Sequence, residues 1–318
     1  MKFSVVIPLY KGAPFIESTL DSVLAQTYNN YEIILVNDES PDNVGEIVKK
    51  YIADHPGVKF IYIEQKNKGL GGARNSALKQ ASGDIIAILD QDDIWYPEKL
   101  ARVAKIYREH PEISITTHNL HDLRDGKIVG VLKNGPGAAD MQRALLYSGN
   151  LLSTPAVTFK KSIIEDVGYF SEDKEQSFLC EDYDLWLRAA AAGHKFYFMP
   201  EILGGYTLHA NNFTNSHRER MYQSVINIIS SQYLKLNNKN IFDWFRFRRA
   251  KANMYYNWSY YLLASGRPLK HSLKYLWKSF KTDPLFFSLY VKVGKIIARK
   301  ILPKRKIGGG NEKIKIKN

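Results

Sequence analysis

Two kinds of hydrophobic pattern alternate along the first 120 residues of the chain. Short runs of apolar residues are typical of strands, and apolar residues that recur about every three to four positions are typical of helices. The expected strands are 3–9, 31–36, 58–63 and 84–89, and the expected helices are 16–26, 42–53 and 71–80. These strands are apolar throughout, as parallel strands covered by helices on both faces usually are. The pattern therefore predicts an α/β fold with a mostly parallel sheet flanked by helices.

The remainder of the chain has a less regular pattern. We expect strands at 114–119, 127–132, 156–159, 195–198 and 206–208, and helices at 138–147 and 181–192. From Glu219 onward the pattern indicates only helices, with breaks at 266–268 and 282–284. Residues 307–318 are polar and basic, a composition that predicts a disordered tail.

Composition narrows the class of protein. The chain has 318 residues, of which 45% are hydrophobic and 24% charged, as expected of a globular protein with a sizeable core. Its single cysteine, Cys180, excludes an internal disulfide and favours a reducing compartment. The first ten residues lack a secretory signal, and no run reaches the roughly 18 apolar residues of a membrane span. We therefore expect a cytoplasmic protein, either soluble or peripheral on the inner face of the cytoplasmic membrane.

The positive charge of the chain is concentrated in its last quarter. The net charge is +13, yet residues 240–318 alone hold 19 Lys or Arg and 3 Asp or Glu. Aromatic residues alternate with these basic residues between 240 and 306. Three interpretations follow: amphipathic helices on an anionic membrane surface, a helical bundle with an aromatic core and a basic solvated face, or a nucleic-acid site. Nucleic acid is the least favoured of the three.

Polar residues follow the expected strands of the first half. In parallel sheets, functional residues gather beyond the carboxyl ends of the strands. Asp90, Asp92 and Asp93 place carboxylates within four positions after the strand 84–89. Such carboxylates raise each other's pKa unless a cation neutralises them, and oxygen ligands suit Mg²⁺ or Mn²⁺. The alternative is a solvated acidic turn that caps the next helix.

Three other segments help to decide between a cation site and a capping acidic turn. Asp38 follows the strand 31–36, where it could cap the next helix or accept a hydrogen bond from a base or ribose. Arg74 ends a glycine-rich segment that lets the backbone approach a ligand, although a surface Arg on a helix is the alternative. Glu181, Asp182 and Asp184 lie in the first turn of an expected helix, where the helix dipole favours carboxylates. Capping alone would explain one of these three acidic residues.

Taken together, these segments resemble family-2 glycosyltransferases with a GT-A fold, of the type that assembles bacterial glycans. The resemblance covers about residues 3–215 and rests on the segments Val5–Tyr10, Val36–Ser40, Asn67–Asn75, Leu89–Asp93 and Glu181–Arg188. It implies a Rossmann-like, mostly parallel sheet with an added C-terminal helical region. The family often has glycine where this chain has Glu39, so the loop after Asp38 departs from the usual pattern.

The resemblance also implies roles by position. It places the nucleotide-sugar donor at six residues: Pro8, Tyr10, Asp38, Asn67, Arg74 and Asp90. Asp92 matches the metal-binding carboxylate, and Asp182 matches the catalytic base, with Glu181 beside it. His209 corresponds to a residue near the diphosphate or metal, although an ordinary polar loop histidine is the alternative. Trp186 either lines the acceptor pocket or fills the core, and the core is favoured.

The implied activity is an inverting transfer, dependent on Mg²⁺ or Mn²⁺, of a hexosyl or N-acetylhexosaminyl group. The expected donor is a nucleotide sugar, by resemblance a UDP-sugar, and the expected acceptor is a hydroxyl of a glycan or of a lipid-linked molecule. This reaction would serve the synthesis of surface polysaccharide or glycoconjugate. A nucleotidyltransferase would need a glycine-rich basic loop after the first strand, which residues 10–14 match poorly. An inactive sugar-nucleotide-binding protein would lack Asp92 or Asp182, and both are present.

The expected domain organisation follows from these assignments. Residues 1–215 form the GT-A domain, with a nucleotide-sugar half at 1–120 and an acceptor half at 121–215. Residues 216–306 form a basic and aromatic helical region, and 307–318 the tail.

Overall fold

The computed structural model of the protein describes residues 1–173, 175–209, 217–286 and 291. A nine-stranded mixed sheet forms its centre, in the order β3-β2-β1-β4-β8-β6-β9-β5, with β7 paired to β6. The strands are β1 (Phe3–Leu9), β2 (Tyr31–Asp38), β3 (Phe60–Gln65), β4 (Ile85–Ile88), β5 (Ile94–Trp95), β6 (Ile113–Arg124), β7 (Lys127–Leu132), β8 (Thr158–Lys160) and β9 (Lys195–Thr207). The helices around it are α1 (Ile16–Leu24), α2 (Val44–Asp54), α3 (Gly69–Gln80), α4 (Lys99–Glu109), α5 (Met141–Ser148), α6 (Ser162–Val167) and α7 (Glu181–Ala191), with a 3-10 turn at Thr154–Ala156.

Helices cover both faces of this sheet, as the uniformly apolar strands predict. Successive side chains of a strand point to opposite faces. In β1, Val5 and Ile7 therefore pack with α1, α2 and α4, whereas Val6 packs with α3, α5 and α7. The expected α/β fold with a mostly parallel sheet is thus confirmed for the first half of the chain, where β1 pairs in parallel with β2 and β4, and β2 with β3.

The parallel pairing brings the polar ends of these strands to one edge. Leu9 lies opposite Asn37, and Asp38 lies opposite Gln65. Residues far apart in sequence thereby surround one region beyond the carboxyl ends of β1, β2 and β4, which is where the sequence predicts the site.

One expectation about the second half was wrong. The segments 195–198 and 206–208, expected as two short strands, belong to a single strand, β9. Its middle contains Pro200, Gly204 and Gly205, which interrupt the apolar pattern. The glycines are required by close packing, because a Cβ on Gly204 would lie 2.7 Å from the carbonyl oxygen of Ile94. The short elements β5 and α6 were not predicted either.

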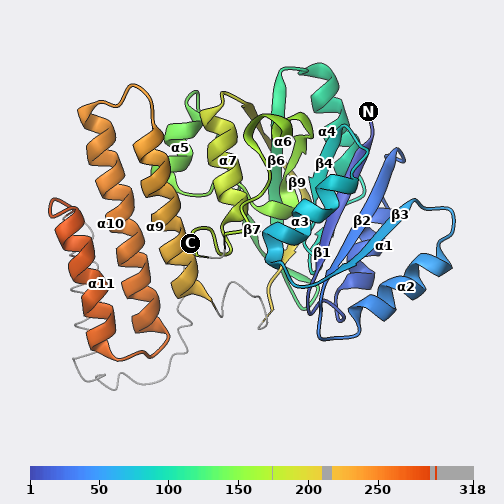
Figure 1. Cartoon of the computed structure of the whole chain (residues 1–318), viewed down its shortest axis with the longest axis horizontal. Helices are drawn as coiled ribbons and strands as arrows, with labels where there is room; N and C mark the ends of the chain where they lie inside the picture. The colour runs from blue at the N-terminus through green and yellow to red at the C-terminus, as the bar shows by residue number, and fades with distance from the viewer. Residues whose placement is uncertain (174, 210–216, 287–290, 292–318) are drawn as a thin grey trace.

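The C-terminal part is helical, as expected from Glu219 onward. It consists of α9 (Arg218–Lys235), α10 (Ile241–Ala264) and α11 (Leu269–Thr282), which lie side by side at the end of the molecule opposite to α2 (Figure 1). An unpredicted break at 236–240 separates α9 from α10. Asp243 in the first turn of α10 accepts hydrogen bonds from Arg143 Nε and the Tyr147 hydroxyl of α5, both at 2.9 Å, and so joins this helical region to the sheet.

Two other expectations, the disordered tail and the domain boundaries, stay predictions. The tail predicted at 307–318 lies outside the described residues, and β6 runs across position 120 and joins both expected halves in one sheet. Within the described part of the chain, no helix combines the length and the apolar character needed to cross a bilayer.

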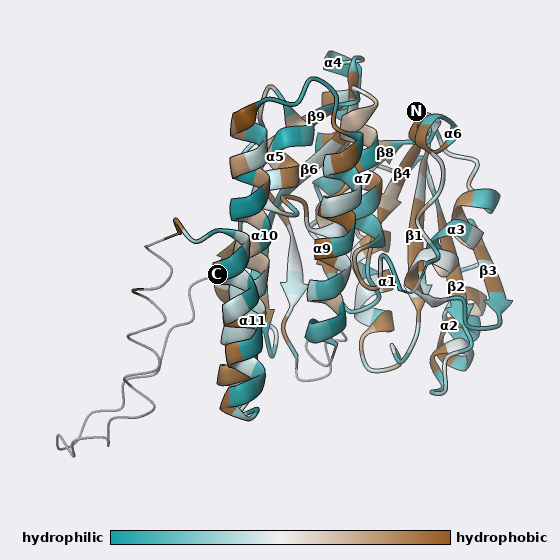
Figure 2. Ribbon diagram, turned by 60° about the vertical axis from the view of Figure 1, so that its left-hand side comes forward, coloured by the Kyte–Doolittle hydropathy of each residue, from teal (hydrophilic) through white to brown (hydrophobic). Residues whose placement is uncertain are grey.

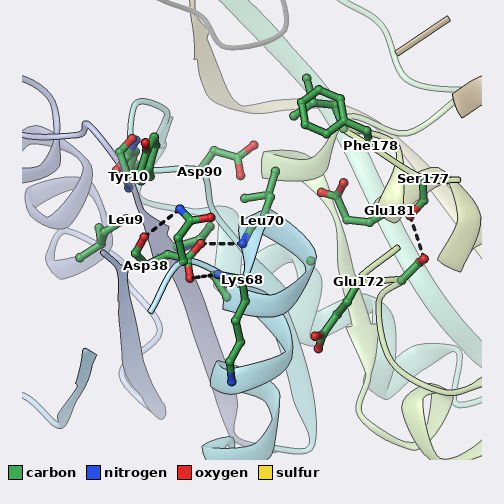
Figure 3. Close-up of a pocket in the computed structure, with 18 of the residues that line it drawn as sticks. Leu9, Tyr10, Asp38, Lys68, Leu70, Asp90, Glu172, Ser177, Phe178 and Glu181 are labelled. Atoms are coloured by element: carbon green, nitrogen blue, oxygen red, sulfur yellow. Dashed lines mark hydrogen bonds between the residues drawn. The ribbon is translucent and has the colours of Figure 1, made fainter. Parts of the chain in front are cut away.

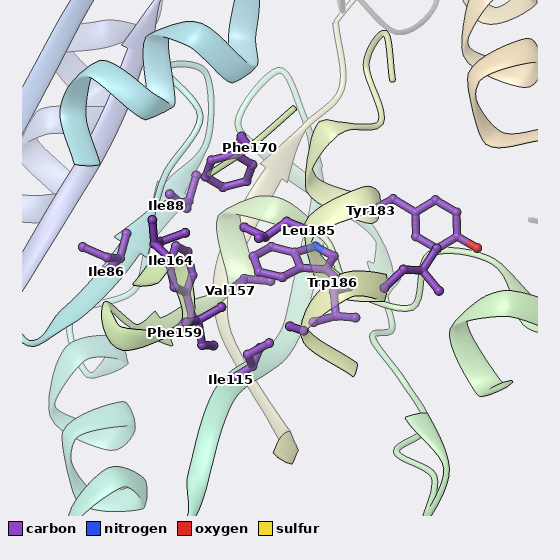
Figure 4. Packing of buried hydrophobic residues seen from close by; sticks show 14 of the residues in the cluster. Ile86, Ile88, Ile115, Val157, Phe159, Ile164, Phe170, Tyr183, Leu185 and Trp186 are labelled. Atoms are coloured by element: carbon purple, nitrogen blue, oxygen red, sulfur yellow. The ribbon is translucent and has the colours of Figure 1, made fainter. Parts of the chain in front are cut away.

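Trp186 lies in the core, the alternative that the sequence favours. Its side chain is fully buried and makes edge contacts with Phe159 and Phe170, at ring-centroid distances of 5.7 and 6.4 Å (Figure 4). Trp186 thus holds α7 on the sheet and does not line the cavity described below.

We expect Trp186→Ala to lower the free energy of unfolding by about 3–5 kcal/mol, because it removes a large buried side chain and leaves a cavity. Urea unfolding monitored by circular dichroism measures this loss. Trp277→Ala, which truncates a tryptophan that is 56% exposed, is the matched control and should change stability by less than about 0.5 kcal/mol. Equal effects of the two substitutions would contradict the packing described for α7.

Candidate active site

A cavity of about 440 Å³ lies beyond the carboxyl ends of β1, β2 and β4, a size typical of sites for small molecules. Seven of the predicted site residues line it: Pro8, Tyr10, Asp38, Asn67, Asp90, Asp92 and Glu181. Figure 3 shows Asp38 and Asp90 on one side of the cavity and Glu181 and Phe178 on the other. Arg74, Asp182 and His209 lie behind or beside this lining rather than in it.

Asp38 is a helix cap, although not of the helix that follows it in sequence. Its carboxylate accepts hydrogen bonds from the backbone N–H groups of Lys68 and Gly69, at 2.9 and 2.8 Å, and from Gln65 Nε2 at 2.7 Å (Figure 3). Gly69, with φ 79°, is in the left-handed region and begins α3. A carboxylate can accept about four hydrogen bonds, so Asp38 keeps capacity for a further donor such as a base N–H.

Arg74 is buried, which excludes the surface alternative. Its side chain is 1% exposed, and its guanidinium donates from Nη1 to Glu181 Oε1 at 2.6 Å and from Nη2 to Asp90 Oδ1 at 2.8 Å. Arg74 therefore joins the acidic cluster after β4 to the first turn of α7. Its direct contact with a nucleotide stays a prediction, because the cavity lining contains its two partners and not Arg74 itself.

The two neighbouring acidic residues of α7 have different surroundings. Glu181 faces the cavity, and burial raises its pKa to about 7, against the lowering effect of Arg74. Asp182 Oδ2 accepts from the Thr154 hydroxyl at 2.9 Å and from Asn150 Nδ2 at 3.2 Å. Burial also raises the pKa of Asp182, again opposed by Arg74.

Asp92 and His209 form the pair that could hold a cation. Asp92 Oδ2 lies 2.8 Å from His209 Nε2, and the His209 ring stacks on Phe15 at 4.4 Å. The pKa of Asp92 is raised by burial and by the charge of Asp90. In the described residues no cluster of three or more potential metal ligands occurs, so a cation here would complete its coordination with oxygens of a bound ligand and water. The carboxylate and the oxygens of ligand and water fit Mn²⁺ or Mg²⁺, whereas the imidazole nitrogen is a poor ligand for Mg²⁺.

Asp93 does not cap the next helix, so the alternative of a capping acidic turn is wrong for this residue. Its side chain is buried and accepts the backbone N–H of Thr207 at 2.8 Å, whereas α4 begins only at Lys99. Burial raises the pKa of Asp93 well above its usual value, with Asp92 and Asp90 adding to the effect. Asp93 therefore joins the acidic loop to the end of β9, next to His209.

Several residues of the site were missed by the sequence analysis. Gln91 exchanges two hydrogen bonds with the backbone of Tyr10, at 2.9 and 2.6 Å, and so ties the loop after β1 to the acidic cluster. Arg220 of α9 lines the cavity, with its guanidinium 3.7 Å from the ring centroid of Phe178. Thr154 and Asn150 lie 28 and 32 residues before Asp182, and no motif or spacing indicates them.

We expect Arg74→Met to lower the free energy of unfolding by about 3–5 kcal/mol near pH 8, because Glu181 would then be buried and charged without a cation beside it. The loss should be smaller near pH 5.5. Glu181 has a folded pKa of about 7, above its unfolded value of about 4.3, so its contribution to stability falls as the pH rises between these two values. Removal of Arg74 raises that pKa further, and acidification neutralises the buried carboxyl group.

Urea unfolding of the wild type and Arg74→Met at both pH values tests this prediction. Arg102→Met is the control, since Arg102 pairs with Glu201 on the surface, with side chains 46% and 34% exposed. It should cost less than about 1 kcal/mol at either pH. A loss for Arg74→Met that does not change with pH would contradict the assignment of the cost to Glu181.

Comparison with known proteins places the chain in a family. Residues 4–168, slightly more than half of the chain, match the family model of glycosyl transferase family 2. WfaP of Escherichia coli, described as a UDP-Glc:alpha-D-GlcNAc-diphosphoundecaprenol beta-1,3-glucosyltransferase, is 31% identical over 240 residues, 75% of this chain and 89% of WfaP. The chain spans 53% of the length of a Nostoc glycosyltransferase and 66% of one from Rickettsia prowazekii.

Solved structures agree with this result at the level of the fold. TarS 1–349 of S. aureus in complex with UDP-GlcNAc has a TM-score of 0.61 at 21% identity, over 81% of this chain and 73% of TarS 1–349. The mannosyltransferase PcManGT of Pyrobaculum calidifontis, in complex with GDP-Man and Mn²⁺, has a TM-score of 0.62. The match covers 94% of this chain and 80% of the PcManGT chain. The fold is therefore GT-A, as the resemblance implies. With the motifs gathered around one cavity and the family match over the same residues, the chain belongs to glycosyl transferase family 2.

Proposed function

We propose that the protein transfers a sugar, with inversion, from a nucleotide-diphosphate donor to a hydroxyl of a glycan acceptor. The observation that carries this proposal is the cavity between Asp38 and Asp90 on one side and Glu181 on the other, with Arg74 behind the lining and paired to both Asp90 and Glu181. A donor that spans the cavity would have its nucleotide against Asp38 and its sugar toward α7. The transferred carbon would then lie near the acidic residues of α7.

The donor side fits a nucleotide and its diphosphate. Pro8 and Tyr10 supply apolar surface for a base, and Asp38 supplies an acceptor for a base N–H. A divalent cation between Asp92, His209 and the diphosphate would neutralise the negative charge that develops on the leaving nucleoside diphosphate. WfaP by its name uses UDP-Glc, and TarS was solved with UDP-GlcNAc, so we propose a UDP-sugar as the donor.

Asp182 is the residue that we propose as the general base. Burial raises its pKa toward the range in which a carboxylate takes a proton from an attacking hydroxyl. Thr154 and Asn150 hold Oδ2 by donating to it, while Glu181 is held by Arg74. Glu181 then positions Asp182 through the first turn of α7. A single displacement with the acceptor opposite to the leaving group inverts the anomeric carbon.

The acceptor side favours a glycan that is carried on a lipid. WfaP by its name acts on a GlcNAc-diphosphoundecaprenol, and the chain is similar to WfaP over most of its length. We therefore propose that the protein elongates a lipid-linked glycan in polysaccharide synthesis.

Release of nucleoside diphosphate from a panel of UDP- and GDP-sugars, with Mn²⁺ or Mg²⁺, tests the function and identifies the donor. We expect turnover with at least one UDP-sugar and its loss in EDTA. Asp92→Ala should lower kcat by about 100-fold or more, because one ligand of the cation is removed. Asp54→Ala, on the exposed end of α2, is the control and should retain full activity. Turnover that persists in EDTA would contradict the metal role, and absence of turnover with every donor would indicate an inactive sugar-nucleotide-binding protein.

Asp182→Asn should lower kcat by about 10³-fold while donor affinity stays within about twofold, because general base catalysis typically contributes about 10²–10⁴. Donor affinity is measured by calorimetry, and turnover by release of nucleoside diphosphate in the presence of acceptor. Glu181→Gln, which keeps a hydrogen-bond acceptor for Arg74, should lose less than about tenfold. A greater loss in Glu181→Gln than in Asp182→Asn would transfer the role of base to Glu181.

A further inference from the structure

The larger apolar side chains of α11 are exposed in the part of the chain that the structure describes. Leu269, Leu273, Trp277 and Phe280 are 43%, 44%, 56% and 41% exposed. They recur at helical spacing and so form one stripe along the helix. A recess of about 430 Å³ opens on this stripe, lined by Leu273, Leu276, Trp277 and Phe280. A surface helix of a protein surrounded by water normally turns such a stripe toward the core.

The side of α11 that faces α10 is instead made largely of small residues. Ser272 and Ser279 are buried there. The hydroxyls of Ser272 and Ser259 lie 2.7 Å apart, and Ser279 Oγ donates to a backbone carbonyl of α10 at 2.8 Å. Tyr275 adds one aromatic contact by stacking on Trp258 at 3.8 Å. The small hydroxyl residues let α10 and α11 approach closely and leave the larger apolar residues of α11 outside this contact.

A row of basic residues runs beside the apolar stripe. Lys270, Lys274, Lys278 and Lys281 each follow a residue of the stripe by one position, so they lie along its flank. The acidic residues between 240 and 286 are Asp243 and Asp283, and both are buried in ion pairs with arginines. The exposed surface of α10 and α11 therefore carries no negative charge to balance the lysines.

The exposed apolar surface continues onto α10. Arg248 of α10 donates to the carbonyl of Thr282, so the end of α11 lies beside the first half of α10. Ile241 and Phe245 lie about two turns and one turn before Arg248 on the same side of α10, and they are 60% and 50% exposed. Figures 1 and 2 show α11 at the outer edge of the molecule, away from the sheet, with apolar and polar residues adjoining on its surface.

We propose that this outer surface, which we name the α11 face (Leu269, Leu273, Trp277 and Phe280 with the adjoining lysine row), docks on a bilayer that contains anionic lipid. The apolar stripe would lie at the boundary of headgroups and acyl chains, with Trp277 at headgroup level and the lysines on lipid phosphates. A second copy of the chain is a poorer occupant, because its own α11 face offers the lysines no acidic partners. This docking is independent of the transfer reaction, so it is tested without turnover.

Co-sedimentation of the full chain with vesicles tests the proposal. We expect binding to vesicles of phosphatidylcholine with phosphatidylglycerol, and markedly weaker binding to phosphatidylcholine alone or at high salt. Leu273→Ser/Trp277→Ser should weaken binding to the anionic vesicles by about tenfold or more, since it removes two side chains that would enter the bilayer. Lys270→Gln/Lys274→Gln should weaken it by about tenfold or more and reduce its dependence on salt.

The control is Ile128→Ser/Val131→Ser on β7, which alters two apolar residues that are 60% and 44% exposed on another part of the surface. It should bind vesicles as the wild type does. Unchanged melting temperatures would show that all variants are folded, as expected for substitutions of exposed side chains. The proposal is overturned if the wild type does not bind anionic vesicles or if Leu273→Ser/Trp277→Ser binds as well as the wild type. It is also overturned if gel filtration shows a wild-type dimer that this variant converts to a monomer while neither protein binds vesicles.

Discussion

The arrangement of the site depends on one buried cation, Arg74. A guanidinium that is 1% exposed is tolerated only beside carboxylates that neutralise and hydrogen-bond it. Asp90 and Glu181 meet this need at 2.8 and 2.6 Å, although Glu181 is 107 residues away in sequence. Their pairing fixes the acidic loop after β4 against the first turn of α7, and Asp182 is held in place with it. The ion pairs of Arg74 therefore hold the loop after β4 and the first turn of α7 together on the two sides of the site.

The single positive charge of Arg74 does not neutralise all the carboxylates around it. The pKa values of Asp92, Asp93, Glu181 and Asp182 are all raised, with burial as the largest cause in each case. A diphosphate entering such a site would be repelled unless positive charge came with it or lay nearby. Arg220 at the cavity wall is placed to lessen this repulsion, and a divalent cation beside Asp92 and His209 would lessen it further.

The sequence predicts the part of this structure that follows from periodicity. Uniformly apolar runs identify β1, β2 and β4, and the carboxyl ends of these strands locate Asp38 and Asp90. The direction of a side chain is not contained in such patterns. Asp38 caps α3 instead of the adjacent α2, and of two neighbouring acidic residues only Glu181 faces the cavity. These outcomes depend on tertiary partners such as Gly69, Arg74 and Thr154, whose positions no local pattern specifies.

The same limit applies to the helical region, with a consequence for function. Periodicity shows that α11 has an apolar side, but only the packing of Ser272 and Ser279 against α10 shows that this side points outward. The helical region also supplies Arg220 to the cavity and is fixed to the sheet through Arg143 and Asp243. An attachment to lipid through the α11 face would therefore set the height of the cavity above the bilayer. For an acceptor carried on a lipid, this would confine donor and acceptor to one layer and reduce the entropy lost when they meet.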